Sequence, residues 1–169
     1  MRLLVLLLGL VLASPLAAGE RSVAPGAGSL ATAIAEAAPG DVLTLTDGTY
    51  LGPVVIDRSL AITGPRGAVV DGQGSGSVVT ITAPDVQLTG FTVTGSGRVN
   101  QDLDAGVKIE KGADRTRVEK LLVTGNMHGI DVHGGRDAVV TDNEIIGTDS
   151  PRMNERGNGI YVWNSPGTL

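Results

Sequence analysis

Residues 128–147 read HGIDVHGGRDAVVTDNEIIG, and this stretch decides the fold. In residues 130–133, isoleucine and valine alternate with aspartate and histidine, which is the two-residue period of a strand with one buried face. Glycines at 134–135 interrupt the run, a second apolar run covers 138–140, and a third follows the Asp-Asn turn at 142–143. The stretch therefore predicts three short strands joined by tight turns.

The same pattern recurs on both sides of this stretch. Four segments share the alternation of its first strand: VTIT (79–82), VKIE (107–110), IDVH (130–133) and IYVW (160–163). They start roughly 23 to 30 residues apart, and a repeat of that length made only of strands and turns indicates a solenoid. We expect an all-β fold, a parallel β-helix that buries one aliphatic face of each coil. The side chains expected to point inward are those of Val107, Ile109, Ile130, Val132, Ile160 and Val162.

One segment has helical character. Ser29 to Ala38 reads SLATAIAEAA, in which Ser29 is a suitable N-cap and the alanines favour a helix. Pro39 and Gly40 end it. A solenoid must cover the apolar end of its first coil, so we expect this helix to cap the stack.

The N-terminus has the layout of a secretory signal peptide over residues 1–19. Arg2 precedes an apolar run over residues 3–12, and small residues follow. The run is too short to span a membrane. We therefore expect an exported chain with one β-helix domain over residues 20–169 and no membrane span of its own once the leader is removed.

The composition restricts the partners and the sources of stability. Thirteen Lys and Arg against 18 Asp and Glu give a net charge of −5, which is poorly suited to binding the phosphates of nucleic acids. The chain has no cysteine, so it relies on neither disulfides nor thiolate metal ligands. Twenty-five glycines and an aromatic content of 2% are typical of a narrow aliphatic core with tight turns.

Two long insertions leave the stack at one corner. They cover residues 96–106 and 148–159, whereas the equivalent connection at 126–129 is short. Insertions that collect on one edge of a repeat protein build a binding face.

Four residues are candidate metal ligands, three of them at this edge and His133 on a strand face away from it. Met127 and His128 lie on the short connection and Met153 lies in the second insertion. Thioether and imidazole groups together suit a soft ion, copper(I) above all. Structural roles are the alternative: Met127 would fill the corner, His128 would face solvent and Met153 would mark a mobile loop. His133 is expected on the outer face of its strand, as a metal ligand or as part of a surface ladder.

The outer face also offers an arrangement for catalysis. Lys108 and Asp131 are expected on adjacent coils, with Glu110 and His133 beside them, and such groups can serve proton abstraction or glycoside cleavage. Charged ladders are common on solvated sheets, and no lyase or hydrolase motif surrounds these residues. We therefore expect a protein that is not an enzyme, and a mild effect of substitutions at Asp131.

At residues 126–134 and 152–167, NMHGIDVHG and RMNERGNGIYVWNSPG resemble the NosD-type proteins that help nitrous oxide reductase to mature. Residues 29–64 are similar to the N-terminal cap and first coils of that family. The resemblance implies a periplasmic, right-handed β-helix. It also implies work with an ABC-type ATPase and permease, and copper supplied to the reductase or exchanged with a copper chaperone.

Carried onto this chain, the resemblance places the copper chemistry at Met127, His128 and Met153, with His133 secondary. NosD-type proteins continue with further coils, so the resemblance also implies a chain truncated at Leu169. Two other functions stay open: a carbohydrate-binding or polysaccharide-processing β-helix, and a purely structural or adhesive solenoid.

Overall fold

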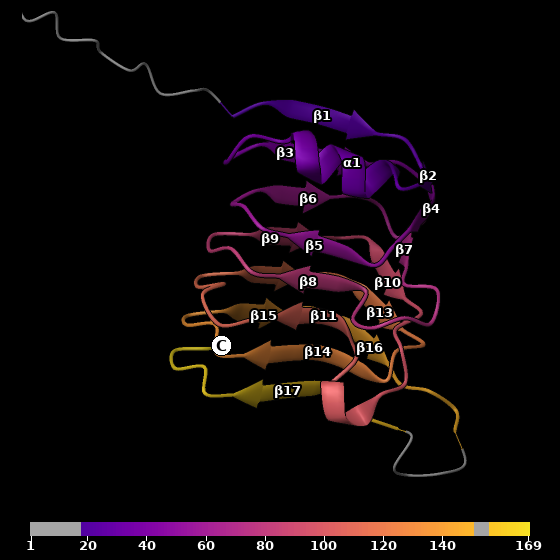
Figure 1. Cartoon of the computed structure of the whole chain (residues 1–169), viewed down its shortest axis with the longest axis vertical. Helices are drawn as coiled ribbons and strands as arrows, with labels where there is room; N and C mark the ends of the chain where they lie inside the picture. Colours follow the sequence, from indigo (N-terminus) through magenta and orange to yellow (C-terminus); the bar gives the residue numbers. More distant parts are fainter. Residues whose placement is uncertain (1–17, 151–155) are drawn as a thin grey trace, which may run out of the picture.

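The computed structural model describes residues 18–150 and 156–169, and these residues form a parallel β-helix (Figure 1). The strands at the front of Figure 1 run to the left, those at the rear run to the right, and successive coils descend, so the coil is right-handed. The predicted signal peptide lies almost wholly outside the described residues. Within residues 18–150 and 156–169, no helix has the length and apolar character needed to cross a membrane.

Three parallel sheets form the walls of the coil. The first contains β1 (Glu20–Val23), β3 (Val42–Leu45), β6 (Ala61–Thr63), β9 (Gln87–Thr89), β12 (Arg117–Glu119) and β15 (Val139–Thr141). The second contains β2 (Gly26–Ala27), β4 (Gly48–Leu51), β7 (Ala68–Asp71), β10 (Thr92–Thr94), β13 (Leu122–Thr124) and β16 (Glu144–Ile146). The third contains β5 (Val54–Ile56), β8 (Val79–Ile81), β11 (Ala105–Ile109), β14 (His128–His133) and β17 (Ile160–Trp163).

The core consists of aliphatic columns that run along the axis. Ile130 pairs with Val107, which pairs with Val79, and all three side chains are buried. Each fully buried side chain of this kind contributes about 1.5–3 kcal/mol relative to an exposed one. The columns confirm the predicted fold and the inward positions of the second and third repeats.

The inward direction predicted for Ile160 and Val162 is also confirmed, although neither side chain is buried. Both continue the inward columns, because they pair with Ile130 and Val132. Each is nevertheless 49% exposed, because among the described residues no strand pairs with the other side of β17.

The capping helix is present, with corrected ends. Helix α1 covers Ser29–Glu36, its N-cap is Gly28 instead of Ser29, and it ends two residues earlier than predicted. Ser29 is already the first helical residue, and its hydroxyl donates to the Gly26 carbonyl. Helix α1 packs against β4 of the second sheet and against β5, the first strand of the third sheet (Figure 1).

A buried asparagine builds the corner between the second and third sheets. Asn126 Oδ1 accepts the Ser96 N–H at 3.0 Å, and Nδ2 donates to the Val93 and Thr124 carbonyls. Gly125 precedes it with φ 68°, a left-handed conformation that glycine adopts without strain. These bonds fix the point at which residues 96–104 leave the coil.

Candidate functional site

Met127 and His128 are buried at this corner. Met127 is 4% exposed and its N–H donates to the Ser96 hydroxyl. His128 is 2% exposed and is the first residue of β14. The solvent-facing alternative for His128 is therefore wrong, because the two insertions enclose the ring.

Both ring nitrogens of His128 are engaged. Nδ1 accepts the Asn158 N–H at 3.0 Å, and Nε2 lies 3.0 Å from Asn100 Oδ1. Because the main-chain N–H of Asn158 can only donate, Nδ1 must be the acceptor. The neutral ring therefore carries its proton on Nε2, which donates to Asn100 Oδ1. Burial lowers the pKa of His128, and the charges of Asp131 and Asp104 oppose this shift only in part. His128 thus links the first insertion to the second.

The four predicted ligands do not form one group. Met153 lies outside the described residues. His133 is at the opposite end of β14 from His128. Five residues of extended strand place the Cα atoms of these two histidines roughly 16 Å apart. Met127 and His128 are together, whereas His133 belongs to another part of the surface.

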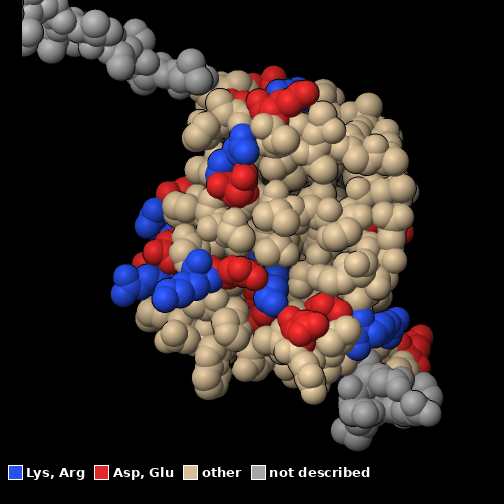
Figure 2. Space-filling model, in the orientation of Figure 1, with Lys and Arg blue, Asp and Glu red and all other residues tan. Residues whose placement is uncertain are grey.

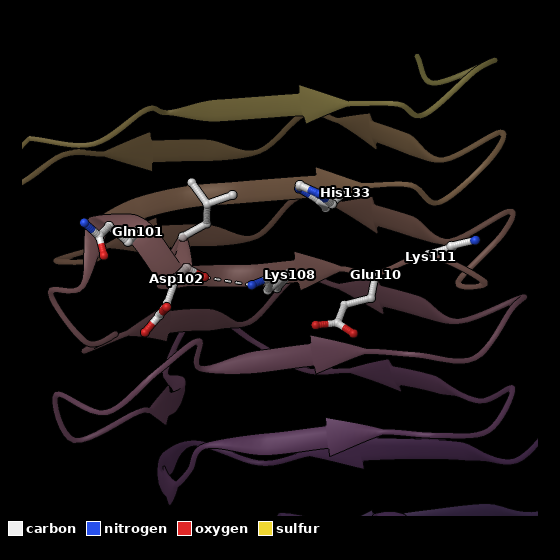
Figure 3. A pocket seen from close by; sticks show the side chains of 7 residues that line it. Gln101, Asp102, Lys108, Glu110, Lys111 and His133 are labelled. Atoms are coloured by element: carbon white, nitrogen blue, oxygen red, sulfur yellow. Dashed lines mark hydrogen bonds between the residues drawn. The ribbon is translucent and has the colours of Figure 1, made fainter.

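His133 borders a cleft of about 500 Å³ on the outer face of the third sheet (Figure 3). In Figure 3, Gln101 and Asp102 of the 3-10 helix η1 (Asn100–Asp102) lie at one end of the cleft. The floor and the other end carry Lys108, Glu110, Lys111 and His133. Lys108 Nζ donates to the Asp102 carbonyl at 2.8 Å, so the first insertion is tied down over the sheet.

Asp131 is the largest departure from the sequence prediction. It lies on the outer face of β14 in register with Lys108 and Tyr161, as expected, but its side chain is 0% exposed. Neither carboxylate oxygen has a hydrogen-bond partner. The predicted solvated ladder is therefore wrong at this position, because the alternation of a strand does not show what covers its outer face. The mild effect expected of substitutions at Asp131 stays a prediction.

The environment of Asp131 disfavours its ionised form. Burial raises the pKa of Asp131, and the charge of Glu110 adds to this effect. His133, Lys108 and His128 act in the opposite direction. His133 Nδ1 is 4.0 Å from Asp131 Oδ1 and also lacks a partner, although the His133 side chain as a whole is 44% exposed.

The sequence could place Asp131 and His133 on one face, but nothing in it showed that Asp131 is covered. Within the described part of the chain, no group of three or more His, Asp or Glu residues is arranged to hold a metal ion. Figure 2 shows charges of both signs intermixed on the face that carries the cleft, without an extended patch of one sign.

The three parallel sheets of stacked strands place this chain in the class of parallel β-helix proteins. A solved alginate lyase from Paenibacillus sp. str. FPU-7 has the same fold, with a TM-score of 0.63. The match covers 87% of this chain and 63% of the lyase at 17% identity, and so concerns the fold alone. No family model matches the sequence.

Sequence comparison gives the relationship within this class. The chain is 35% identical over 142 residues to the "Probable ABC transporter binding protein NosD" of Pseudomonas aeruginosa, covering 79% of this chain and 33% of that protein. It is 33% identical over 141 residues to the NosD protein of Stutzerimonas stutzeri, covering 76% of this chain and 32% of that protein. The predicted resemblance is confirmed: this chain is a relative of the NosD proteins. It spans about a third of the length of the curated relatives it matches.

Proposed function

We propose that this chain acts in the periplasm as a non-enzymatic accessory protein of nitrous oxide reductase maturation and handles copper there with an ABC-type transporter. The observation that carries the proposal is the 35% identity to a NosD protein over 142 residues. The name of that relative supports association with an ABC transporter, and copper is the cargo that the resemblance implies. The partners proposed are the ATPase and permease, together with the reductase or a copper chaperone.

The corner can take part only by exchanging a contact. Copper at Met127 and His128 would replace one of the two hydrogen bonds of His128. The bond to the Asn158 N–H is the one to exchange, because Nδ1 holds the free lone pair of the ring, whereas Nε2 carries the proton and keeps its bond to Asn100. Two thioethers and an imidazole bind copper(I) without a thiolate that would trap it, as a transfer site requires.

Deletion of the gene in its host tests the role in maturation. We expect nitrous oxide reductase purified from the deletion strain to contain less copper, and the parent gene to restore it. A Val132→Asp gene serves as a control for loss of the fold. Full copper loading in the deletion strain would refute the proposed function.

Competition with a copper(I) chelator tests the ligands, using Met127→Leu, His128→Ala, Met153→Leu and His133→Ala. Leucine approximately keeps the volume of methionine, so weaker binding by these variants reports lost ligand chemistry. Equal affinity in the parent and in all four variants would show that the copper(I) site lies elsewhere.

A second candidate function is binding of an acidic oligosaccharide in the cleft. It is favoured by the charged lining and by Trp163, which is 58% exposed and in register with His133. An exposed indole offers a flat apolar face beside hydrogen-bonding groups. Trp163 is the only tryptophan of the chain, so its fluorescence reports binding. Titration with uronate oligomers should change the emission, and Lys108→Gln should weaken the response; an unchanged emission would exclude this function.

A further inference from the structure

Unpaired buried polar atoms concentrate at one place in the molecule. Among the described residues, four buried side-chain nitrogen or oxygen atoms lack a hydrogen-bond partner, and three of them are the two oxygens of Asp131 and Nδ1 of His133. Folded proteins leave few such atoms, because each costs free energy. Their convergence indicates a third group that contacts both side chains.

The spacing of these atoms fits a metal ion. Asp131 Oδ1 and His133 Nδ1 are 4.0 Å apart. Bonds from a zinc-sized ion to imidazole nitrogen and carboxylate oxygen are roughly 2.0–2.2 Å each, so an ion between the two atoms reaches both. The second oxygen of Asp131 also lacks a hydrogen-bond partner, so it is a third potential donor.

We propose that Asp131 and His133 bind a divalent first-row metal ion between them, with copper(II) bound most tightly. Imidazole and carboxylate suit this ion, and the general order of affinities places copper(II) above the other divalent ions of the row. Glu110 adds negative charge near the pair, whereas Lys108 opposes a cation but is held by the Asp102 carbonyl.

The arrangement supplies an incomplete set of ligands. Two residues provide at most three donor atoms, and the exposed side of His133 borders the cleft (Figure 3). Because all three donor atoms are buried, a further ligand, either water or a donor of a partner protein, would have to enter from the cleft beside His133. Transfer of the ion from this site to another protein would rest on the proposed function, whereas binding of the ion at this site does not depend on it.

Titration of the purified, metal-free chain with copper(II) tests the site, read by chelator competition and by Trp163 fluorescence. The register neighbour of His133 is Trp163, so an ion at His133 should quench its emission. Asp131→Asn and His133→Gln should each weaken binding by at least about tenfold. Asp102→Asn removes a carboxylate from the same cleft and should leave affinity within about twofold. Met127→Leu is the matched control at the corner.

Electron paramagnetic resonance provides a readout independent of affinity. One imidazole nitrogen should couple to the copper(II) signal of the parent, and His133→Gln should abolish that coupling. Circular dichroism verifies that both variants fold. If the parent binds no copper(II), or Asp131→Asn and His133→Gln bind as tightly as the parent, the site is refuted and a bridging water is the group between the two side chains. Loss of affinity only in Met127→Leu also refutes it, while leaving copper handling and the deletion experiment intact.

Discussion

Replacing Asp131 by Asn should stabilise the protein at neutral pH. Asn has the shape of Asp without the charge. The parent buries a carboxylate with 0% exposure and two oxygens without partners. An unsatisfied buried group costs about 1–3 kcal/mol, and more when it is charged. Since the Asn amide also stays unpaired, we expect a gain in the lower part of that range, about 1–2 kcal/mol.

The pH dependence of this gain has a definite sign. Burial raises the pKa of Asp131 above its ordinary value of 3.8. Below that ordinary value the carboxyl is protonated in both the folded and the unfolded chain, so the parent and Asp131→Asn should be about equally stable. As the pH rises through the folded pKa, the parent loses this stability and the variant keeps it.

Urea unfolding in the presence of a chelator, followed by Trp163 fluorescence at several pH values, measures the difference. A thermal melt can measure the same difference, because for a domain of this size about 1 kcal/mol of unfolding free energy corresponds to roughly 2–4 °C in melting temperature. Asp102→Asn is the matched control, because it removes the same charge from an exposed position in the same cleft, and it should change stability by less than about 0.5 kcal/mol. A variant less stable than the parent at neutral pH, or a gain that does not grow with pH, would refute the reasoning.

Three further substitutions test the core, the corner and the loop contacts. Val132→Asp places a charge in a fully buried column and should cost more than about 3 kcal/mol in thermal melts, whereas Val55→Asp, at a 56% exposed position, should cost far less. His128→Gln should cost about 1–3 kcal/mol above pH 6.5. Because burial lowers the pKa of His128, the parent loses this advantage as the pH falls below 6.5 and through the folded pKa, so urea midpoints of the two proteins should converge there. Asn126→Ala removes the acceptor of the Ser96 N–H and the donor to two carbonyls, so we expect a loss of about 2–3 kcal/mol and faster hydrogen exchange at Ser96; unchanged exchange would contradict the role of the corner.

The coil could be predicted from sequence because its period is local. Alternation in residues 130–133 fixes which side chains face inward, and the spacing of the repeats fixes which strands stack. The register of Val79 with Val107 and of Val107 with Ile130 follows from the aligned segments and is confirmed. The ends of α1 were less accurate, because Gly28 and Ser29 are both acceptable N-caps.

The candidate site could be predicted only in part, because it depends on what the insertions cover. A strand pattern distinguishes the inner from the outer face but does not show which outer residues a loop shields. The burial of His128 could not be predicted for this reason, because residues 100 and 158 reach back across the corner and their contacts with His128 are set by tertiary structure. The burial of Asp131 could not be predicted either, because strand alternation places it only on the outer face. The separation of His133 from the corner follows from the strand itself, because His133 comes five residues after His128 along an extended chain, and the structure confirms it.

The bonds of His128 to both insertions constrain how this surface can evolve. Asn100 and Asn158 belong to insertions that leave different coils, yet one imidazole satisfies both. A deletion in either insertion would leave one ring nitrogen buried and unpaired, so the lengths of the two insertions should covary among relatives that keep histidine at this position. Where the histidine is replaced, that constraint disappears, and each insertion is free to change length independently.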